Sequence, residues 1–535
     1  MDALAVAVLI LVAAIATVTF RDYGLGWDDY THSQYGDLLV SLYASGFADK
    51  RALSFVNLYM YGGGFDLLSA LAAKVLPFSL FETRRLVGAA IGIVGLLVTW
   101  RLGRRVGGPL AGLIALLLLA ACPLYYGHMF INAKDGPFAA ANVLALLGIV
   151  RAFEEYPRAT PATIALCGVG LGLAIGARIL GGFTVLDALL PLLFILAIRS
   201  HASGFKPALG EWSWYLVAFI PAAILAYLIM GLVWPWSVVA PLNPVRAAEY
   251  FSRFFEKPWH ELFAGHLIEV TQMPREYVPV LLALQVPILM LSTGLAGTVG
   301  AFITAVRGSQ HEADIRRRAV LLALVLAPTV PVAVTVATQP GLYNGIRHYV
   351  FILPPLAVLG GLSVASIAQR LERFGHLAMV AGALAVVTGV ASPVVEMVRL
   401  HPYEYTYYNR LVGGSLGARP RYMLDYWGLS MTQASWRLRA LVAERGEKPH
   451  GATWSVAVCG PHPAVAVALG PQYAAIWKPK GADFAMMLGE FYCAKLDAPV
   501  LFEIVREGVV YARVYDIRGR SIPTLLTVRG PDADD

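Results

Sequence analysis

Residues 86–124 read LVGAAIGIVGLLVTW-RLGRRV-GGPLAGLIALLLLAACPL, two apolar runs separated by a short turn that carries three arginines. A helix needs about 20 apolar residues to cross the hydrocarbon core of a bilayer, which is roughly 30 Å thick. The runs Leu86–Trp100 and Gly107–Leu124 therefore predict two consecutive, rather short membrane spans. The arginines predict a cytoplasmic turn, because lysine and arginine concentrate in the short loops on that side.

Similar apolar stretches recur through the first three quarters of the chain. Leu58–Leu76 is also apolar, but three glycines and Asp66 interrupt it, so it predicts a re-entrant or interfacial helix as an alternative to a span. Together with the two runs above, the remaining stretches predict about eleven spans: Met1–Phe20, Pro137–Val150, Pro161–Ala177, Gly181–Ile198, Trp214–Val233, Val278–Val299, Ala319–Ala337, Tyr349–Ile367 and Leu377–Val395.

The composition agrees with a membrane protein. Apolar residues make up 58% of the 535 residues and charged residues only 14%, against roughly 25% charged in a soluble domain. This excludes a disordered chain, a coiled coil, a disulfide scaffold and an ordinary cytosolic enzyme. The net charge of +7 does not indicate nucleic-acid binding, since the excess in a membrane protein lies in cytoplasmic loops.

The character of the chain changes near residue 397. From Met397 to Asp535, 16 Lys/Arg and 13 Asp/Glu fall in 139 residues, whereas the first 396 residues hold the other 48 of the 77 charges. We therefore predict a transmembrane module over residues 1–396 and a soluble domain over residues 397–535.

The basic loops predict the orientation of the spans. Lysine and arginine cluster near residues 101–105, 151–158, 199–206, 307–318 and 370–373, which we expect on the cytoplasmic side. The outward loops are then residues 21–85, 125–136, 234–277 and 338–348. With eleven spans the N-terminus is cytoplasmic and the C-terminal domain faces outward. The first span lacks the basic start of a signal peptide and carries Asp2, so we expect it to stay uncleaved.

The C-terminal part predicts a small α/β domain. Met431–Glu444 predicts a helix, and Gly508 fits a hairpin turn. Cys459 and Cys493 both lie in this outward domain, where a disulfide can persist if their backbones approach closely. The predicted strands are Trp454–Cys459, Ala464–Leu469, Phe484–Leu488, Val500–Val505 and Val509–Tyr515.

Ionisable residues gather in the outward loops, at one face of the membrane, where their burial would be costly without a function. The segment Ala247–His266 alternates basic and aromatic residues and predicts either a surface helix beside lipid or an ordered loop. The candidate site residues come from three of these loops and from one outward turn: Asp28, Asp29 and His32; His128, Lys134 and Asp135; Arg347 and His348; and Arg178.

These residue types suit transfer of a group from an anionic donor. One of two adjacent carboxylates can act as a general base, because a like-charged neighbour raises a pKa toward neutrality. Arginine and lysine stabilise the charge that grows on a phosphate leaving group. Asp28, Asp29 and Asp135 could also hold Mg²⁺ or Mn²⁺ through carboxylate oxygens. For the Asp28-Asp29 pair taken alone, a solvated cap at the membrane surface is the simpler interpretation.

The order of these motifs resembles the C-type glycosyltransferase fold, and within it the bacterial family 39 enzymes related to protein O-mannosyltransferases and lipid A aminoarabinose transferases. The resemblance covers about residues 1–400. It rests on Trp27-Asp28-Asp29, Arg101-Leu102-Gly103-Arg104-Arg105, Pro123 through Asp135-Gly136-Pro137, and Arg347-His348-Tyr349 leading into Leu353-Pro354-Pro355.

The resemblance implies inverting transfer of a hexosyl or pentosyl group from a polyprenyl-phosphate donor to a lipid, glycan or protein acceptor on the periplasmic face of a bacterial inner membrane. The family's first outward loop usually carries Asp-Glu with the first acid as base, a role that falls by position on Asp28. Here the pair is Asp-Asp, so it stays open whether Asp29 shares the role of base with Asp28. The alternative function is a transporter or flippase of a polyprenyl-linked or other lipid, although transporters place their charges near the bilayer midplane.

Overall fold

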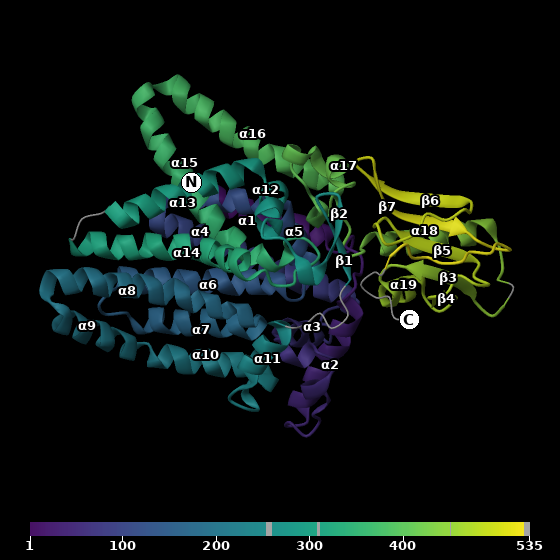
Figure 1. Ribbon diagram of the computed structural model, residues 1–535, viewed down its shortest axis with the longest axis horizontal. Coiled ribbons are helices and arrows are strands. Elements are labelled where there is room, and N and C mark those ends of the chain that lie inside the picture. The colour runs from purple at the N-terminus through teal and green to yellow at the C-terminus, as the bar shows by residue number, and fades with distance from the viewer. Residues whose placement is uncertain (253–258, 308–310, 450, 529–535) are drawn as a thin grey trace.

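The computed structural model describes residues 1–252, 259–307, 311–449 and 451–528. It is an elongated molecule, with a helical bundle at one end and a small α/β domain at the other (Figure 1). The bundle helices are α1 (Asp2–Thr19), α4 (Leu80–Ala120), α6 (Asp135–Glu154), α7 (Pro161–Ala177), α8 (Phe183–Ser203), α9 (Phe205–Ala218), α10 (Ile220–Val233), α13 (Ile288–Arg307), α14 (Glu312–Thr338), α15 (Leu353–Leu371) and α16 (His376–Leu400).

The bundle accounts for the predicted spans. Within the described residues, nine helices are long and apolar enough to cross a membrane, and α7 is a shorter apolar helix. α4 contributes two passages, because the chain reverses at Gly108, where φ is +83° and the helix is interrupted. Glycine adopts this backbone conformation without strain. A Cβ atom on Gly103 would lie 3.1 Å from the Cα of Gly112, so the two halves pack closely beside the turn.

One predicted span is displaced. Val278–Val299 is interrupted at Val286-Pro287, so α12 (Tyr277–Gln285) is separate from the membrane helix α13. The prediction was wrong there because Pro287 has no N–H to continue the helical hydrogen bonds. The stretch Leu58–Leu76 forms only the 3-10 turn η2 (Leu58–Met60) and the short helix α3 (Gly64–Ala72), too short to span a bilayer.

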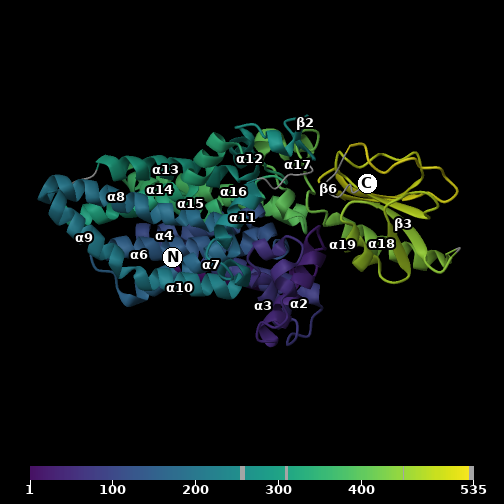
Figure 2. The ribbon, with the colours of Figure 1, turned by 60° about the horizontal axis from the view of Figure 1, so that its bottom comes forward.

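The loops predicted to face outward, called the outward loops below, fold into short elements between the bundle and the α/β domain. Helix α2 runs steeply across the direction of the bundle helices, with α3 beside it (Figures 1 and 2). In the segment Ala247–His266, residues 253–258 lie outside the described residues. The residues before this gap belong to helix α11, and those after it include strand β1 and the start of β2. The outward elements are α2 (Asp29–Ala44), η1 (Arg51–Ser54), α5 (Pro123–Ile131), η3 (Ile179–Gly182), η4 (Pro235–Val238), α11 (Asn243–Ser252), β1 (His260–Phe263), β2 (His266–Glu269), η5 (Val270–Gln272) and η6 (Arg347–Ile352).

The C-terminal domain is a five-stranded sheet in the order β4-β3-β5-β7-β6, with α18 and α19 on one face (Figure 2). β4, β3 and β5 are parallel, and β7 is antiparallel to β5 and β6. The elements from the end of α15 onward are η7 (Glu372–Phe374), η8 (Glu404–Thr406), η9 (Arg410–Val412), α17 (Gly414–Ala418), α18 (Ser430–Arg445), β3 (Trp454–Cys459), α19 (His462–Leu469), β4 (Tyr473–Ile476), β5 (Phe484–Leu488), β6 (Val500–Arg506) and β7 (Val509–Asp516).

Most of the domain's predicted elements are confirmed, and one is wrong. The helix from Met431 and four of the five strands are present. Ala464–Leu469 lies in helix α19 rather than in a strand, because its run of small and apolar residues fits either element and Pro463 begins a helix well. Gly508 has φ +74° in the tight turn between β6 and β7. Cys459 and Cys493 form a disulfide with a Cα–Cα distance of 5.8 Å.

Candidate functional site

Asp28 precedes helix α2 and faces the second outward loop. Its side chain is half-buried and lines a small pocket together with Lys134 and Trp427. Its carboxylate has no hydrogen bond or ion pair with any residue that the structure describes. Burial opposes its charged form, but Lys134, His32 and Arg347 together outweigh this effect and lower the pKa of the Asp28 carboxyl below its ordinary value. The predicted rise of this pKa toward neutrality is therefore wrong, because nearby cations dominate over the neighbouring carboxylate. Asp28 is therefore an ionised carboxylate with no hydrogen-bond or ion-pair partner in the part of the chain that the structure describes.

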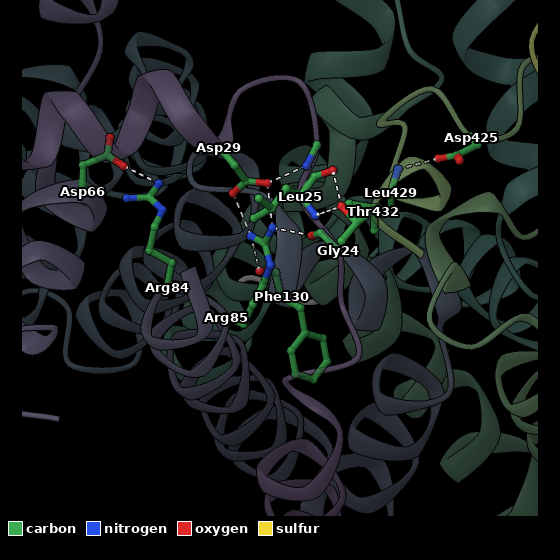
Figure 3. Close-up of polar contacts among 11 residues, drawn as sticks. Gly24, Leu25, Asp29, Asp66, Arg84, Arg85, Phe130, Asp425, Leu429 and Thr432 are labelled. Atoms are coloured by element: carbon green, nitrogen blue, oxygen red, sulfur yellow. Dashed lines mark hydrogen bonds and ion pairs between the residues drawn. The ribbon is translucent and has the colours of Figure 1, made fainter. Parts of the chain in front are cut away.

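Asp29 has a different environment from its neighbour. Both of its carboxylate oxygens accept hydrogen bonds from the guanidinium of Arg85 on α4, at 2.8 and 2.6 Å, and one also accepts from the Gly26 N–H at 2.8 Å (Figure 3). Arg85 also donates to the carbonyl of Gly24 at 2.6 Å. Asp29 is buried, so this bidentate pair fixes the first outward loop against the bundle.

Replacing Asp29 with asparagine should therefore reduce stability more than it reduces catalysis. Removing one partner of a buried ion pair leaves an uncompensated charge and costs about 3–5 kcal/mol. We expect a lower melting temperature and a low yield of folded protein, measured by thermal unfolding in detergent. Glu276→Gln, at an exposed carboxylate of another outward segment, should leave the melting temperature unchanged. Normal stability with a large loss of rate would instead favour a direct chemical role for Asp29.

Another buried carboxylate, Asp66 on α3, lies close to this loop. It accepts hydrogen bonds from His32 Nδ1 and from the guanidinium of Arg84, each at 2.7 Å. His32 is thus held by Asp66, while Arg84 and Arg85 on α4 hold two different acids (Figure 3). The cluster ties α2 and α3 to the start of α4.

The second outward loop presents Asp135 to two arginines. Asn132 donates to Asp135 Oδ2 at 2.7 Å, and its own Oδ1 accepts from the Asp135 N–H at 2.8 Å. Arg178, at the end of α7, lies 2.7 Å from Asp135 Oδ1, and Arg347 lies 3.6 Å from Oδ2. Asp135 is buried, so it anchors two cations from distant parts of the chain.

Lys134 and Arg347 are two of the groups whose charge lowers the pKa of Asp28. The Lys134 ammonium lies 4.0 Å above the ring of Tyr61. Burial lowers the pKa of Lys134 to about 8, although the charge of Asp28 acts in the opposite direction. The Arg347 guanidinium is buried and lies 4.8 Å from the ring centres of both Tyr343 and Trp427. These cations are desolvated and oriented before any ligand arrives.

The two remaining predicted histidines lie near the same loops. His128 on α5 is fully buried, with Nε2 3.0 Å from the Tyr426 hydroxyl and Nδ1 3.2 Å from Asn132 Nδ2. Burial lowers the pKa of His128 to about 3, so the ring is neutral at physiological pH. His348 packs edge-on against Tyr343, with ring centres 5.2 Å apart.

The structure thus brings the predicted residues of all the outward segments together at one end of the bundle. A shared divalent cation does not fit them, because Asp29 is paired with Arg85 and Asp135 with Arg178. Among the described residues, no group of three or more His, Cys, Asp or Glu is arranged to hold a metal ion.

Sequence reasoning missed several members of this site. Asp66 and the pair Arg84-Arg85 lie within or beside apolar stretches. In a membrane protein, charged residues in such positions indicate either a functional site or a buried ion pair. Trp427, by contrast, comes from the C-terminal domain, and no sequence pattern indicates that it reaches the membrane module.

Three carboxyl groups are buried around the loop that carries Arg347 and in the adjoining domain. Glu261 Oε1 accepts hydrogen bonds from the Tyr277 hydroxyl at 3.1 Å and from the Asn344 N–H at 3.0 Å. Glu490 Oε1 accepts from the Leu424 N–H at 3.0 Å. Burial raises the pKa of Glu261 to about 7, that of Asp425 to about 6 and that of Glu490 to about 8.

These raised pKa values predict that the three carboxyl groups contribute less to stability as the pH rises. Between the ordinary carboxyl range and about pH 8, the folded state holds a proton on Glu490 that the unfolded chain has released, so the contribution of Glu490 to the free energy of unfolding decreases with pH. Glu490→Gln keeps an acceptor for Leu424 but cannot ionise. Relative to wild type, its melting temperature should therefore rise as the pH increases from about 5 to about 8, the range in which the folded wild-type protein loses the stabilising proton on Glu490.

Glu444→Gln, at an exposed position on α18, is the matched control and should keep the wild-type dependence. Identical pH curves for wild type and Glu490→Gln would contradict the proton uptake at Glu490.

Comparisons with known proteins bear on the fold that carries these residues. A family model described as dolichyl-phosphate-mannose-protein mannosyltransferase matches residues 64–230, which run from α3 to α10. No curated protein matches the chain. Among solved structures, the archaeal oligosaccharyltransferase AglB from Archaeoglobus fulgidus, in complex with an inhibitory peptide and a dolichol-phosphate, has a TM-score of 0.50 at 14% identity. That alignment covers 90% of this chain and 65% of AglB.

ArnT from Cupriavidus metallidurans bound to undecaprenyl phosphate gives a TM-score of 0.49 at 16% identity, covering 96% of this chain and 97% of that one. The arabinosyltransferase EmbB from Mycobacterium smegmatis gives 0.35 at 17% identity, covering 74% and 41%.

Proposed function

We propose that this multi-pass membrane protein, which has the fold of the C-type glycosyltransferases, transfers one sugar from a polyprenyl-phosphate donor to an acceptor hydroxyl at the outward membrane face. The observation that carries the proposal is the environment of Asp28. This carboxylate has no structural partner among the described residues, and it lies in a pocket beside a desolvated lysine. A carboxylate held free next to cations suits proton abstraction beside an anionic leaving group.

In the proposed reaction the acceptor oxygen attacks the anomeric carbon from the side of Asp28. The new C–O bond forms as the bond between that carbon and the phosphate oxygen breaks, which inverts the configuration. The acceptor proton passes to Asp28, and the electron pair of the broken bond stays on the polyprenyl phosphate. No metal ion takes part in this scheme.

Lys134 and Arg347 stabilise the charge that develops on the departing phosphate. Arg347 is only 3.6 Å from Asp135, so a phosphate oxygen can become its main partner. Arg178 stays with Asp135, at 2.7 Å. His128 is neutral and orients a hydroxyl group rather than contributing charge. His32 and His348 border the loops that carry Asp28 and Arg347, so in this proposal they orient donor or acceptor groups.

We place the protein in a bacterial inner membrane, with the N-terminus cytoplasmic and the C-terminal domain, from about residue 397, periplasmic. The α8–α9 turn lies at the end of the bundle opposite the C-terminal domain (Figure 1), and Arg199 on α8 and Lys206 on α9 flank it in the sequence. This arrangement fits the preference of basic residues for the cytoplasmic side.

The orientation predicts how two cysteines react. Cys459 and Cys493 should resist a membrane-impermeant thiol reagent in whole cells before reduction and react after it, because they are disulfide-bonded on the outward side. The buried Cys122 and Cys167 should stay unlabelled in both conditions. A reporter fused after Asp535 that is active only in the cytoplasm would contradict the orientation.

The direct test is turnover by the purified full chain with a panel of polyprenyl-phosphate sugars, with lipid, glycan and peptide acceptors. Mass spectrometry should detect an acceptor that has gained one sugar, in an amount equal to the polyprenyl phosphate released. Transfer from nucleotide sugars and not from lipid donors would overturn the proposal.

A further inference from the structure

The segment Asp425–Thr432 of the C-terminal domain reaches the first outward loop and binds its backbone. Thr432 Oγ1 accepts from the Leu25 N–H at 2.8 Å and donates to the Leu25 carbonyl at 3.4 Å (Figure 3). The Trp27 N–H donates to the Trp427 carbonyl at 3.3 Å. These contacts lie immediately before Asp28 in the chain.

The approach of the two segments requires a glycine. A Cβ atom on Gly26 would lie 1.9 Å from the indole ring of Trp427, a distance that no side chain can tolerate. The indole therefore packs directly on the backbone of the loop that carries Asp28. Its other surroundings include His128, whose ring centre is 6.0 Å away.

The same indole also contacts the arginine of another loop. The Arg347 guanidinium lies 4.8 Å from the ring centre of Trp427 and 4.8 Å from that of Tyr343. Tyr343 belongs to the membrane module and Trp427 to the C-terminal domain, so each part of the protein supplies one ring. Such cation–π contacts orient a guanidinium without neutralising its charge.

The segment is itself held rigidly. The Asp425 carboxylate accepts hydrogen bonds from the Leu429 N–H at 3.0 Å, from the Ser430 N–H at 3.1 Å and from the Tyr405 hydroxyl. Tyr426 adds the contact with His128. A rigid support of this kind fixes the position of the groups that it carries.

From these contacts we propose that Trp427 is a positioning residue, through which the C-terminal domain holds Arg347 in place to bind the donor phosphate. The proposal rests on the proposed function and deepens it, since it assigns the C-terminal domain a part in donor binding. Without the indole, Arg347 keeps its charge but loses one of the two rings that define its orientation.

Binding of undecaprenyl phosphate to the purified full chain tests the proposal. Trp427→Ala should weaken binding about 3- to 30-fold, the range expected for loss of a desolvated cation–π contact. Trp427→Phe keeps an aromatic ring and should retain most of the affinity. The matched control is Trp436→Ala, since Trp436 is an exposed tryptophan on α18 of the same domain and should have wild-type affinity.

Coupling to Arg347 distinguishes positioning from a general structural role. In an Arg347→Ala background, Trp427→Ala should weaken binding by less than about 2-fold further, because its partner is already absent. An equal loss in both backgrounds would overturn the proposal. If the melting temperature shows that Trp427→Ala does not fold, Trp427→Phe and Trp427→Leu replace it in the same double-mutant cycle. Equal affinities of these two variants for undecaprenyl phosphate would also overturn the proposal.

The binding assay separates the two levels of inference. Wild-type affinity in folded Trp427→Ala overturns the positioning role and leaves the proposed function intact. Failure of the wild-type protein to bind undecaprenyl phosphate at all overturns both.

Discussion

Asp28→Asn should lower the single-turnover rate of sugar transfer by about 10²–10⁴, the usual contribution of a general base. Asparagine keeps the shape of the side chain but cannot accept the proton of an attacking hydroxyl. Because the Asp28 carboxylate has no hydrogen-bond partner among the described residues, the substitution should leave the melting temperature and donor binding largely unchanged. The measurement is quenched-flow transfer with saturating enzyme, together with thermal unfolding of the same preparation.

Asp37→Asn is the matched control, since Asp37 lies exposed on the same helix, α2, and should transfer sugar at the wild-type rate. Near-wild-type rates in both Asp28→Asn and folded Asp29→Asn would contradict the mechanism and would favour the transporter alternative. Asp135→Asn should also impair turnover, because it releases Arg178 and Arg347 from a common anchor.

Arg347→Ala should weaken use of the donor by about 2–5 kcal/mol in kcat/KM, the cost of removing a desolvated charge partner. The guanidinium is buried between two rings, so water cannot replace its contact with a phosphate. Arg347→Lys should recover only part of the loss, because an ammonium lacks the planar fork that stacks on aromatic rings and binds phosphate oxygens in pairs. Steady-state kinetics with varied donor concentration measure both effects.

Arg275→Ala provides the control for general loss of outward positive charge, since Arg275 is exposed in another outward segment and should keep wild-type donor kinetics. Wild-type kinetics in Arg347→Ala as well would remove this residue from the proposed site.

The sequence by itself determined the membrane architecture. Long apolar stretches specify spans because each must satisfy its backbone hydrogen bonds internally in lipid, a constraint that does not depend on tertiary contacts. The change in charge density near residue 397 likewise predicts that a soluble domain follows the bundle. Even here a local feature was missed: a hydropathy pattern does not register the break at Pro287, which displaced one span.

Only the tertiary structure decided how the acids of the outward loops divide their roles. Asp28 and Asp29 are adjacent and identical in type, yet Asp29 is paired with Arg85, which lies 56 residues away, and Asp28 has no such partner in the described structure. The placement of Trp427 beside Arg347 and Gly26 depends on contacts across the whole chain. Whether a carboxylate is free or paired depends on which distant charge folding brings within hydrogen-bond reach, and local sequence patterns carry no record of that distance.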